Sequence, residues 1–116
     1  MIVKSENSQI LAFLEQLVKL NQTLAKIFKS GDISHLTEMN AVIKEMYRLQ
    51  HGSEDDAFRL IDEDCKIIYG NFDMLIAVLR TTEDGELDGG AQTALNKLLG
   101  NIHDASVSIA TVFGLV

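Results

Sequence analysis

The chain has few of the residue types that interrupt helices or cross-link a fold. It is 116 residues long, contains no proline and no tryptophan, has one cysteine and is only 6% aromatic. Because proline breaks the hydrogen-bond ladder inside a helix, its absence permits long uninterrupted helices. The single cysteine, Cys65, excludes an intramolecular disulfide and suits a reducing compartment. The core is therefore expected to consist mainly of Leu, Ile, Val, Met and Ala.

The sequence also lacks a basic cluster and a long apolar run. Ten Lys and Arg stand against 17 Asp and Glu, for a net charge of −7. Nucleic acids and anionic membranes are usually bound through basic patches, so neither is expected as a partner. No segment approaches the about 20 apolar residues of a transmembrane helix, and the N-terminus does not resemble a secretory signal. We therefore expect a cytoplasmic protein.

Apolar residues recur with helical spacing in four segments, which predict helices at about residues 5–29, 34–50, 54–82 and 90–113. The clearest alternation of three- and four-residue steps lies in the last two segments. Those positions are Phe58, Ile61, Cys65, Ile68, Phe72, Leu75 and Leu79, and then Ala91, Leu95, Leu98, Ile102, Ala105, Ile109 and Val112. Because the period continues across Gly70, the third helix is expected to be continuous.

Short polar segments rich in glycine separate these helices. Gly31 is expected to end the first helix, with Asp32 or Ser34 capping the next, while Gly52 ends the second. Short connections imply antiparallel neighbours, so residues 1–116 are predicted to form one all-α domain, an up-down-up-down antiparallel four-helix bundle. The second helix is the shortest, and should leave part of a groove open to a second copy, a partner segment or the C-terminal tail.

The C-terminal tail carries no charged side chain after Asp104. A helix that is apolar on all sides is normally covered on all sides, and this stretch is too short to span a bilayer. It therefore predicts a protein interface, most simply in a homodimer. The expected interface residues are Ala105, Ile109, Val112, Phe113, Leu115 and Val116.

Acidic residues are concentrated at the start of the third predicted helix. Asp55 and Asp62 share one heptad position, and Asp56 and Glu63 share another, so that the four form an outward face. Compensation of the helix dipole by a solvated surface is the favoured interpretation. A docking face for a basic partner is the alternative.

A second acidic segment, "DGELDGG", partly matches a calcium-binding loop. Asp84, Glu86 and Asp88 occupy the first, third and fifth positions of an EF-hand loop, but the twelfth position is Leu95 instead of a bidentate Glu. These residues are weak metal candidates, and a helix connection is favoured. No metal or other cofactor is expected.

No set of side chains suggests catalysis. The three histidines lack the partners of a phosphotransfer, di-metal or nucleophilic site, and Cys65 lies on a core stripe where burial would make it inert. No catalytic residue is therefore assigned, and the chain is not expected to be an enzyme. Asn21, inside the first apolar seam, could either fix the register of a buried contact or reach water at an edge.

These observations favour a non-catalytic helical protein–protein interaction module. In size, acidity and helical character the chain resembles small cytoplasmic escort proteins such as secretion chaperones or adaptors, a likeness of class carried by no motif. One alternative is an immunity or anti-toxin-like inhibitor that uses the acidic face. Another is a metal- or ligand-binding regulator that uses the Asp84–Asp88 loop.

Overall fold

A computed structural model describes residues 8–53, 55–80 and 89–115 of the chain. These residues contain five α-helices and one 3-10 turn, with no strand, which confirms the all-α prediction. The elements are α1 (Ser8–Ser30), η1 (Ile33–His35), α2 (Leu36–His51), α3 (Ala57–Leu60), α4 (Asp62–Arg80) and α5 (Gly89–Val112). The predicted number of four helices is not met, because the third predicted helix is divided.

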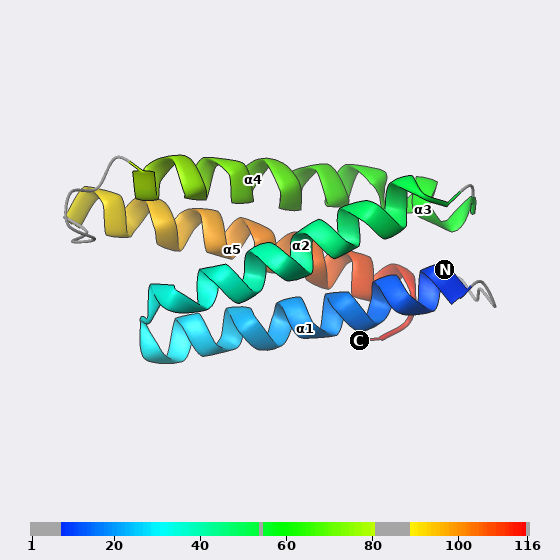
Figure 1. The fold of residues 1–116 in the computed structure, drawn as a ribbon, viewed down its shortest axis with the longest axis horizontal. Coiled ribbons are helices and arrows are strands. Elements are labelled where there is room, and N and C mark those ends of the chain that lie inside the picture. The colour runs from blue at the N-terminus through cyan, green and yellow to red at the C-terminus, as the bar shows by residue number, and fades with distance from the viewer. Residues whose placement is uncertain (1–7, 54, 81–88, 116) are drawn as a thin grey trace.

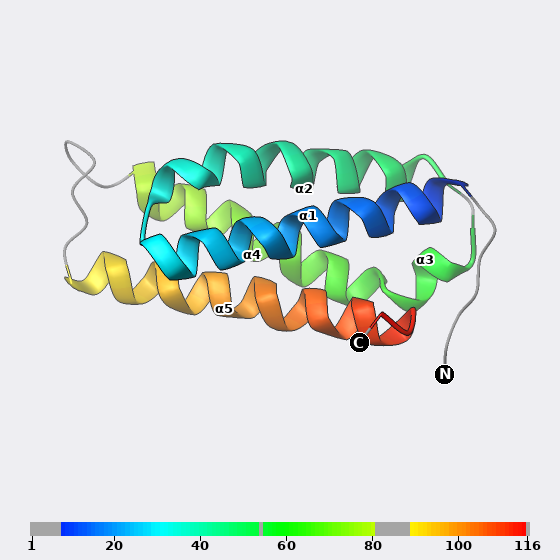
Figure 2. The same ribbon diagram turned by 90° about the horizontal axis from the view of Figure 1, so that it is seen from below.

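The four long helices lie side by side, and each runs opposite to the long helix before it (Figure 1). α1 packs against α2, α4 packs against α5, and α1 also packs against α5. α2 and α4 form the remaining pair, at one side of the molecule (Figures 1 and 2). At 16 residues α2 is the shortest of the four, as its sequence predicts.

Local sequence signals set the turn between α1 and α2. Gly31 has a φ of 69°, a conformation that glycine adopts without steric cost, and its N–H donates to the carbonyl of Ile27 at 2.8 Å. Asp32 precedes η1, and its Oδ1 accepts from the Ser34 N–H at 2.9 Å. Both the expected glycine end and the expected Asp cap are confirmed. The same hydrogen bond lowers the pKa of Asp32.

The helix expected over residues 54–82 is interrupted at Ile61. The Ile61 N–H bonds to the carbonyl of Phe58, three residues back, instead of four, and α4 starts afresh at the next residue. Ile61 itself is fully buried, so the apolar period runs through the break and conceals it. At Gly70, by contrast, α4 is continuous, as predicted.

The core consists of the apolar stripes of all four long helices, joined by Phe58 of α3. The Phe58 ring meets the fully buried Phe13 ring of α1 edge-on, with centroids 5.3 Å apart and planes at 84°. This edge-to-face arrangement is a favourable geometry for aromatic pairs. It ties the short helix to the bundle. Phe28, near the C-terminal end of α1, is 51% exposed.

Candidate functional site: a groove between α2 and α4

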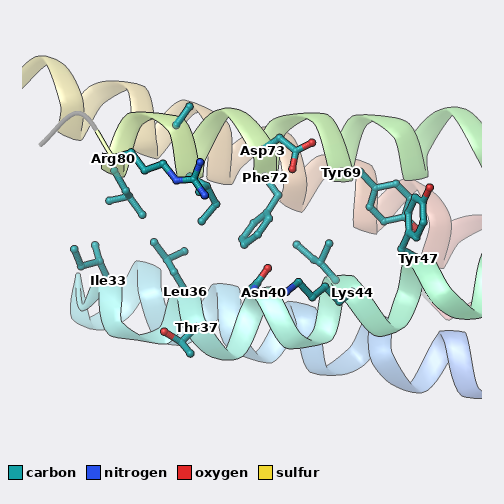
Figure 3. A pocket seen from close by; sticks show the side chains of 14 residues that line it. Ile33, Leu36, Thr37, Asn40, Lys44, Tyr47, Tyr69, Phe72, Asp73 and Arg80 are labelled. Atoms are coloured by element: carbon teal, nitrogen blue, oxygen red, sulfur yellow. The ribbon is translucent and has the colours of Figure 1, made fainter.

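An open groove of about 1020 Å³ runs between α2 and α4 (Figure 3). Its lining is largely apolar, with Leu36, Ile43 and Phe72 buried at the base and Ile33, Ile76 and Leu79 half-buried around them. The expected uncovered groove is therefore present, but it lies alongside the second long helix and not beyond its end. The sequence signal for it was limited to the short length of that helix.

Bulky side chains hold the two walls apart at one end of the groove. Tyr47 of α2 and Tyr69 of α4 meet edge-on with ring centroids 5.3 Å apart (Figure 3). Since the distance between packed helices follows the size of the side chains at their contact, two facing tyrosines keep α2 and α4 well separated. Neither tyrosine was singled out as a site residue, because each lies on an ordinary apolar face when its own helix is considered alone.

Three side chains, which we call the polar clasp, connect the walls at this same end: Gln50, Asp62 and Tyr69. The Tyr69 hydroxyl donates to Gln50 Oε1 at 2.7 Å, and Gln50 Nε2 donates to Asp62 Oδ1 at 3.2 Å. Gln50 is buried, so both ends of its amide need partners and both have them. The clasp joins α2 to α4 where the groove closes.

The Cys65 thiol lies next to the Tyr69 hydroxyl of the clasp. The residue is fully buried, and burial raises the pKa of its thiol to about 12. Burial also raises the pKa of the Tyr69 hydroxyl, with a further contribution from Cys65. Both groups are therefore neutral at physiological pH, and a buried, protonated thiol is a poor nucleophile.

Charged side chains lie only along the rims of the groove. Lys44 extends from the α2 wall, whereas Asp73 and Arg80 extend from the α4 wall (Figure 3). All three are exposed. In a chain of net charge −7, a rim with two cations and one anion differs in sign from the molecule as a whole.

The tail residues predicted as an interface are placed mostly inside the chain's own bundle. Ala105, Ile109 and Phe113 are buried, Val112 is half-buried and only Leu115 is exposed. The sixth predicted residue, Val116, lies outside the described residues.

A glycine turn ends α5 and folds the tail back. Gly114 has a φ of 71°, its N–H donates to the Thr111 carbonyl at 3.1 Å, and the Leu115 N–H donates to the Ala110 carbonyl at 2.8 Å. This is a Schellman ending, which the Phe-Gly-Leu sequence could have predicted. The exposed apolar surface left near the tail includes Val107 and Leu115.

Asn21 and Ser106 connect α1 to α5. The fully buried Ser106 hydroxyl donates to Asn21 Oδ1 at 2.7 Å, and Asn21 Nδ2 donates to the carbonyl of Leu17 at 3.2 Å. Asn21 is half-buried. Asn21 therefore makes a polar contact between helices while lying at a partly exposed edge of the bundle.

The four residues of the predicted acidic face are engaged within the chain. Asp55 Oδ1 accepts from the N–H of Ala57, the first residue of α3, at 2.9 Å. Asp56 lies 3.6 Å from Arg59, while Asp62 and Glu63 lie 3.0 and 3.7 Å from Lys66 Nζ. The hydrogen bond to Asp62 raises the pKa of Lys66. These local pairs are compatible with the favoured interpretation, which is compensation of the helix dipole by a solvated surface.

The weak metal candidates Asp84, Glu86 and Asp88 lie outside the described residues. Within the part of the chain that the structure describes, no three His, Cys, Asp or Glu side chains are grouped so as to hold a metal ion. The same part of the chain has no helix both long enough and apolar enough to cross a membrane.

Comparison of the sequence with protein-family models and curated proteins, and of the fold with solved structures, gave no match. The geometry of the groove is therefore the basis for a functional assignment.

Proposed function

We propose that the protein is a non-catalytic helical interaction module that holds an amphipathic helix of a partner protein in the α2–α4 groove. The observation that supports this is the open apolar channel between two long antiparallel helices. Recognition of a helix in a groove uses apolar anchors spaced by three and four residues, which fit between two such walls. The wall from Leu36 to Tyr47 extends about 16 Å at 1.5 Å per residue, enough for about three turns of a bound helix.

In this proposal the chain acts as an adaptor- or chaperone-like protein of the cytoplasm, without a cofactor. Self-association through the tail is a separate part of the proposal. It would use Val107 and Leu115, since the other apolar residues of the described tail are at least half-buried in the bundle. Light scattering after gel filtration tests it, and a 12.8 kDa species at high micromolar concentration would contradict the homodimer.

Selection of helical peptides from a displayed library against the whole protein tests the groove. Ala77 lines the α4 wall and is exposed, so Ala77→Gln lengthens a neutral side chain into the channel. Ala41 is an exposed alanine of α2 that does not line the groove, and Ala41→Gln is the matched control. We expect selected peptides to lose at least about tenfold in affinity for Ala77→Gln, equivalent to about 1.4 kcal/mol, and to bind the control like the wild type.

Peptides that bind both variants equally well would overturn the proposal, and so would a selection that recovers no binder. Circular dichroism of the two variants verifies that each is as helical as the wild type. The sequences of the binders provide a further criterion, because the proposal requires apolar residues with a helical period.

A further inference from the structure

The charged rim of the groove has a defined register. α2 and α4 are antiparallel, and the contact between Tyr47 and Tyr69 fixes which residues face each other (Figure 3). About one turn along from this pair, Lys44 lies opposite Asp73. Two further turns along, at the open end, Arg80 lies on the α4 wall opposite Thr37 of α2. The two levels are about 10 Å apart at 1.5 Å per residue.

Neither cation of the rim is neutralised within the described chain. The ion pairs there use other bases: Lys26, Arg48, Arg59 and Lys66, together with two histidines. Lys44 and Asp73 face each other without coming within ion-pair distance, because the groove separates them. The rim therefore presents one positive charge on each wall, at different levels, to whatever occupies the groove.

We infer that the partner helix carries two carboxylates on opposite edges of its apolar stripe, at levels about 10 Å apart along the helix axis. This inference rests on the proposed function. One carboxylate meets Lys44 at the α2 wall, and the other meets Arg80 at the α4 wall. An acidic residue beside Asp73 is disfavoured, and a basic residue is favoured there, because like charges repel across a short distance.

The arrangement also sets the direction of the bound helix. Two carboxylates on opposite edges look the same when the helix is turned end for end, so the two cations alone accept either direction. Turning the helix end for end exchanges the position opposite Lys44 with the position opposite Arg80. These two positions differ, because the first is Asp73 and the second is the neutral Thr37. A helix that bears a base opposite Asp73 therefore has one preferred orientation.

Binding measurements with a peptide from the selection above test the inference. A fluorescein-labelled binder is compared with its Glu-to-Gln variants by anisotropy, against the wild type, Lys44→Gln and Arg80→Gln. Lys97→Gln is the matched control, because Lys97 is exposed on α5, outside the groove, and forms no ion pair within the described chain. Each rim substitution should weaken binding about two- to fivefold at low salt, the range of an exposed ion pair, and Lys97→Gln should not.

Three outcomes would overturn the inference. In the first, the selected peptides bind Ala77→Gln more weakly than the wild type, but the edges of their apolar stripe are neutral or basic. Their affinity is then unchanged by Lys44→Gln and Arg80→Gln. The groove would then still bind helices, and only the charge assignment would fall. In the second, peptide affinity is also unchanged by Ala77→Gln, which would contradict the proposed function as well as the inference. In the third, light scattering shows a dimer that Ala77→Gln dissociates, which would make a second copy the occupant.

Discussion

The α1–α5 pair and the α2–α4 pair are both formed by long antiparallel helices of the same bundle, yet one is closed and the other is open. At the closed contact, α5 presents the small, buried Ser106, whose hydroxyl reaches Asn21 of α1. At the open contact, Tyr47 and Tyr69 face each other, and the groove extends from this pair along α2 and α4. Small residues let helices approach closely, whereas bulky ones at the same level keep them apart.

The difference shows where this molecule obtains stability and where it offers a surface. At the closed contact the Ser106 side chain is fully buried, and the apolar core is continuous around it. The open pair is joined through the polar clasp of Gln50, Asp62 and Tyr69, and its rims stay charged. Substitutions at the closed contact are therefore expected to change the free energy of unfolding, and those in the groove to change binding.

The largest contrast is expected between two isoleucines, one from each region. Ile109 of α5 is fully buried, and Ile109→Ala should reduce the free energy of unfolding by about 2–5 kcal/mol through lost burial and a residual cavity. Ile76 lies half-buried in the groove wall, and Ile76→Ala should cost less than about 1 kcal/mol. Urea denaturation followed by circular dichroism measures both.

If Ile109→Ala does not fold, Ile109→Val provides the same comparison, with an expected cost of about 0.5–1.5 kcal/mol. Equal costs at the two positions would mean that the groove is as tightly packed as the core. The contrast between the two regions would then be wrong.

Alkaline pH should act on the open pair and not on the closed contact. Cys65, with a pKa raised to about 12, and Tyr69, with its pKa also raised, lie at the clasp, whereas Asn21 and Ser106 do not titrate. A thiol in the unfolded chain has a pKa of about 8.5. The stability that the neutral thiol contributes is therefore complete below that pH and is lost as pH rises toward 12.

The expected loss is on the order of 5 kcal/mol at most, since one pKa unit corresponds to about 1.4 kcal/mol. Urea denaturation between pH 8 and 11 should show the free energy of unfolding falling less steeply for Cys65→Ala than for the wild type. The thiol should also react with Ellman's reagent far more slowly in the folded protein than in urea. Identical pH profiles for the two proteins would contradict the assignment.

The features that sequence reasoning predicted are those that depend on neighbours in the chain. The turn at Gly31 and the cap at Asp32 each require only a few adjacent residues, and both are present. The period of α5 likewise placed Leu95, Ile102 and Ile109 in the core, and all three are buried. A helical period shows which side of a helix is apolar, so it predicts the buried residues correctly wherever that side is covered by the rest of the chain.

The same period could not reveal the break at Ile61 or the exact place of the groove. Ile61 lies on the apolar side whether or not the helix breaks there. Its N–H bonds three residues back instead of four, and this change does not alter the apolar period of the sequence. The groove depends on Tyr47 and Tyr69 meeting across two helices, and the apolar period of each helix alone does not show which of its residues face the other helix. In the tail, the sequence pattern around an apolar residue such as Phe113 is the same whether its own bundle or a second copy of the chain covers the residue.

A smaller effect is expected from removing one hydrogen bond in each region. Ser106→Ala removes the donor to Asn21, and Tyr69→Phe removes the donor to Gln50. Each should reduce the free energy of unfolding by about 0.5–1.5 kcal/mol, with Ser106→Ala the larger because Ser106 is completely buried. Ser108→Ala, which removes an exposed hydrogen bond to Asp64, is the control and should cost less than either.

A double-mutant cycle sharpens this test at the closed contact. Asn21→Ala and Ser106→Ala together should cost less than the sum of the two single substitutions, because each alone already removes their shared hydrogen bond. Strict additivity would show that the contact between α1 and α5 does not depend on this pair.

The smallest effect on stability is expected at the rim cations, and that small effect is itself informative. Lys44 and Arg80 are exposed and form no ion pair within the described chain, so Lys44→Gln and Arg80→Gln should change the free energy of unfolding by no more than about 0.5 kcal/mol. Thermal and urea denaturation measure this on the same samples used for peptide binding. A loss of stability above about 1 kcal/mol would indicate that the cations hold the bundle together. Unchanged stability combined with weakened peptide binding would separate the two regions completely, with the closed contact maintaining the fold and the open pair recognising the partner.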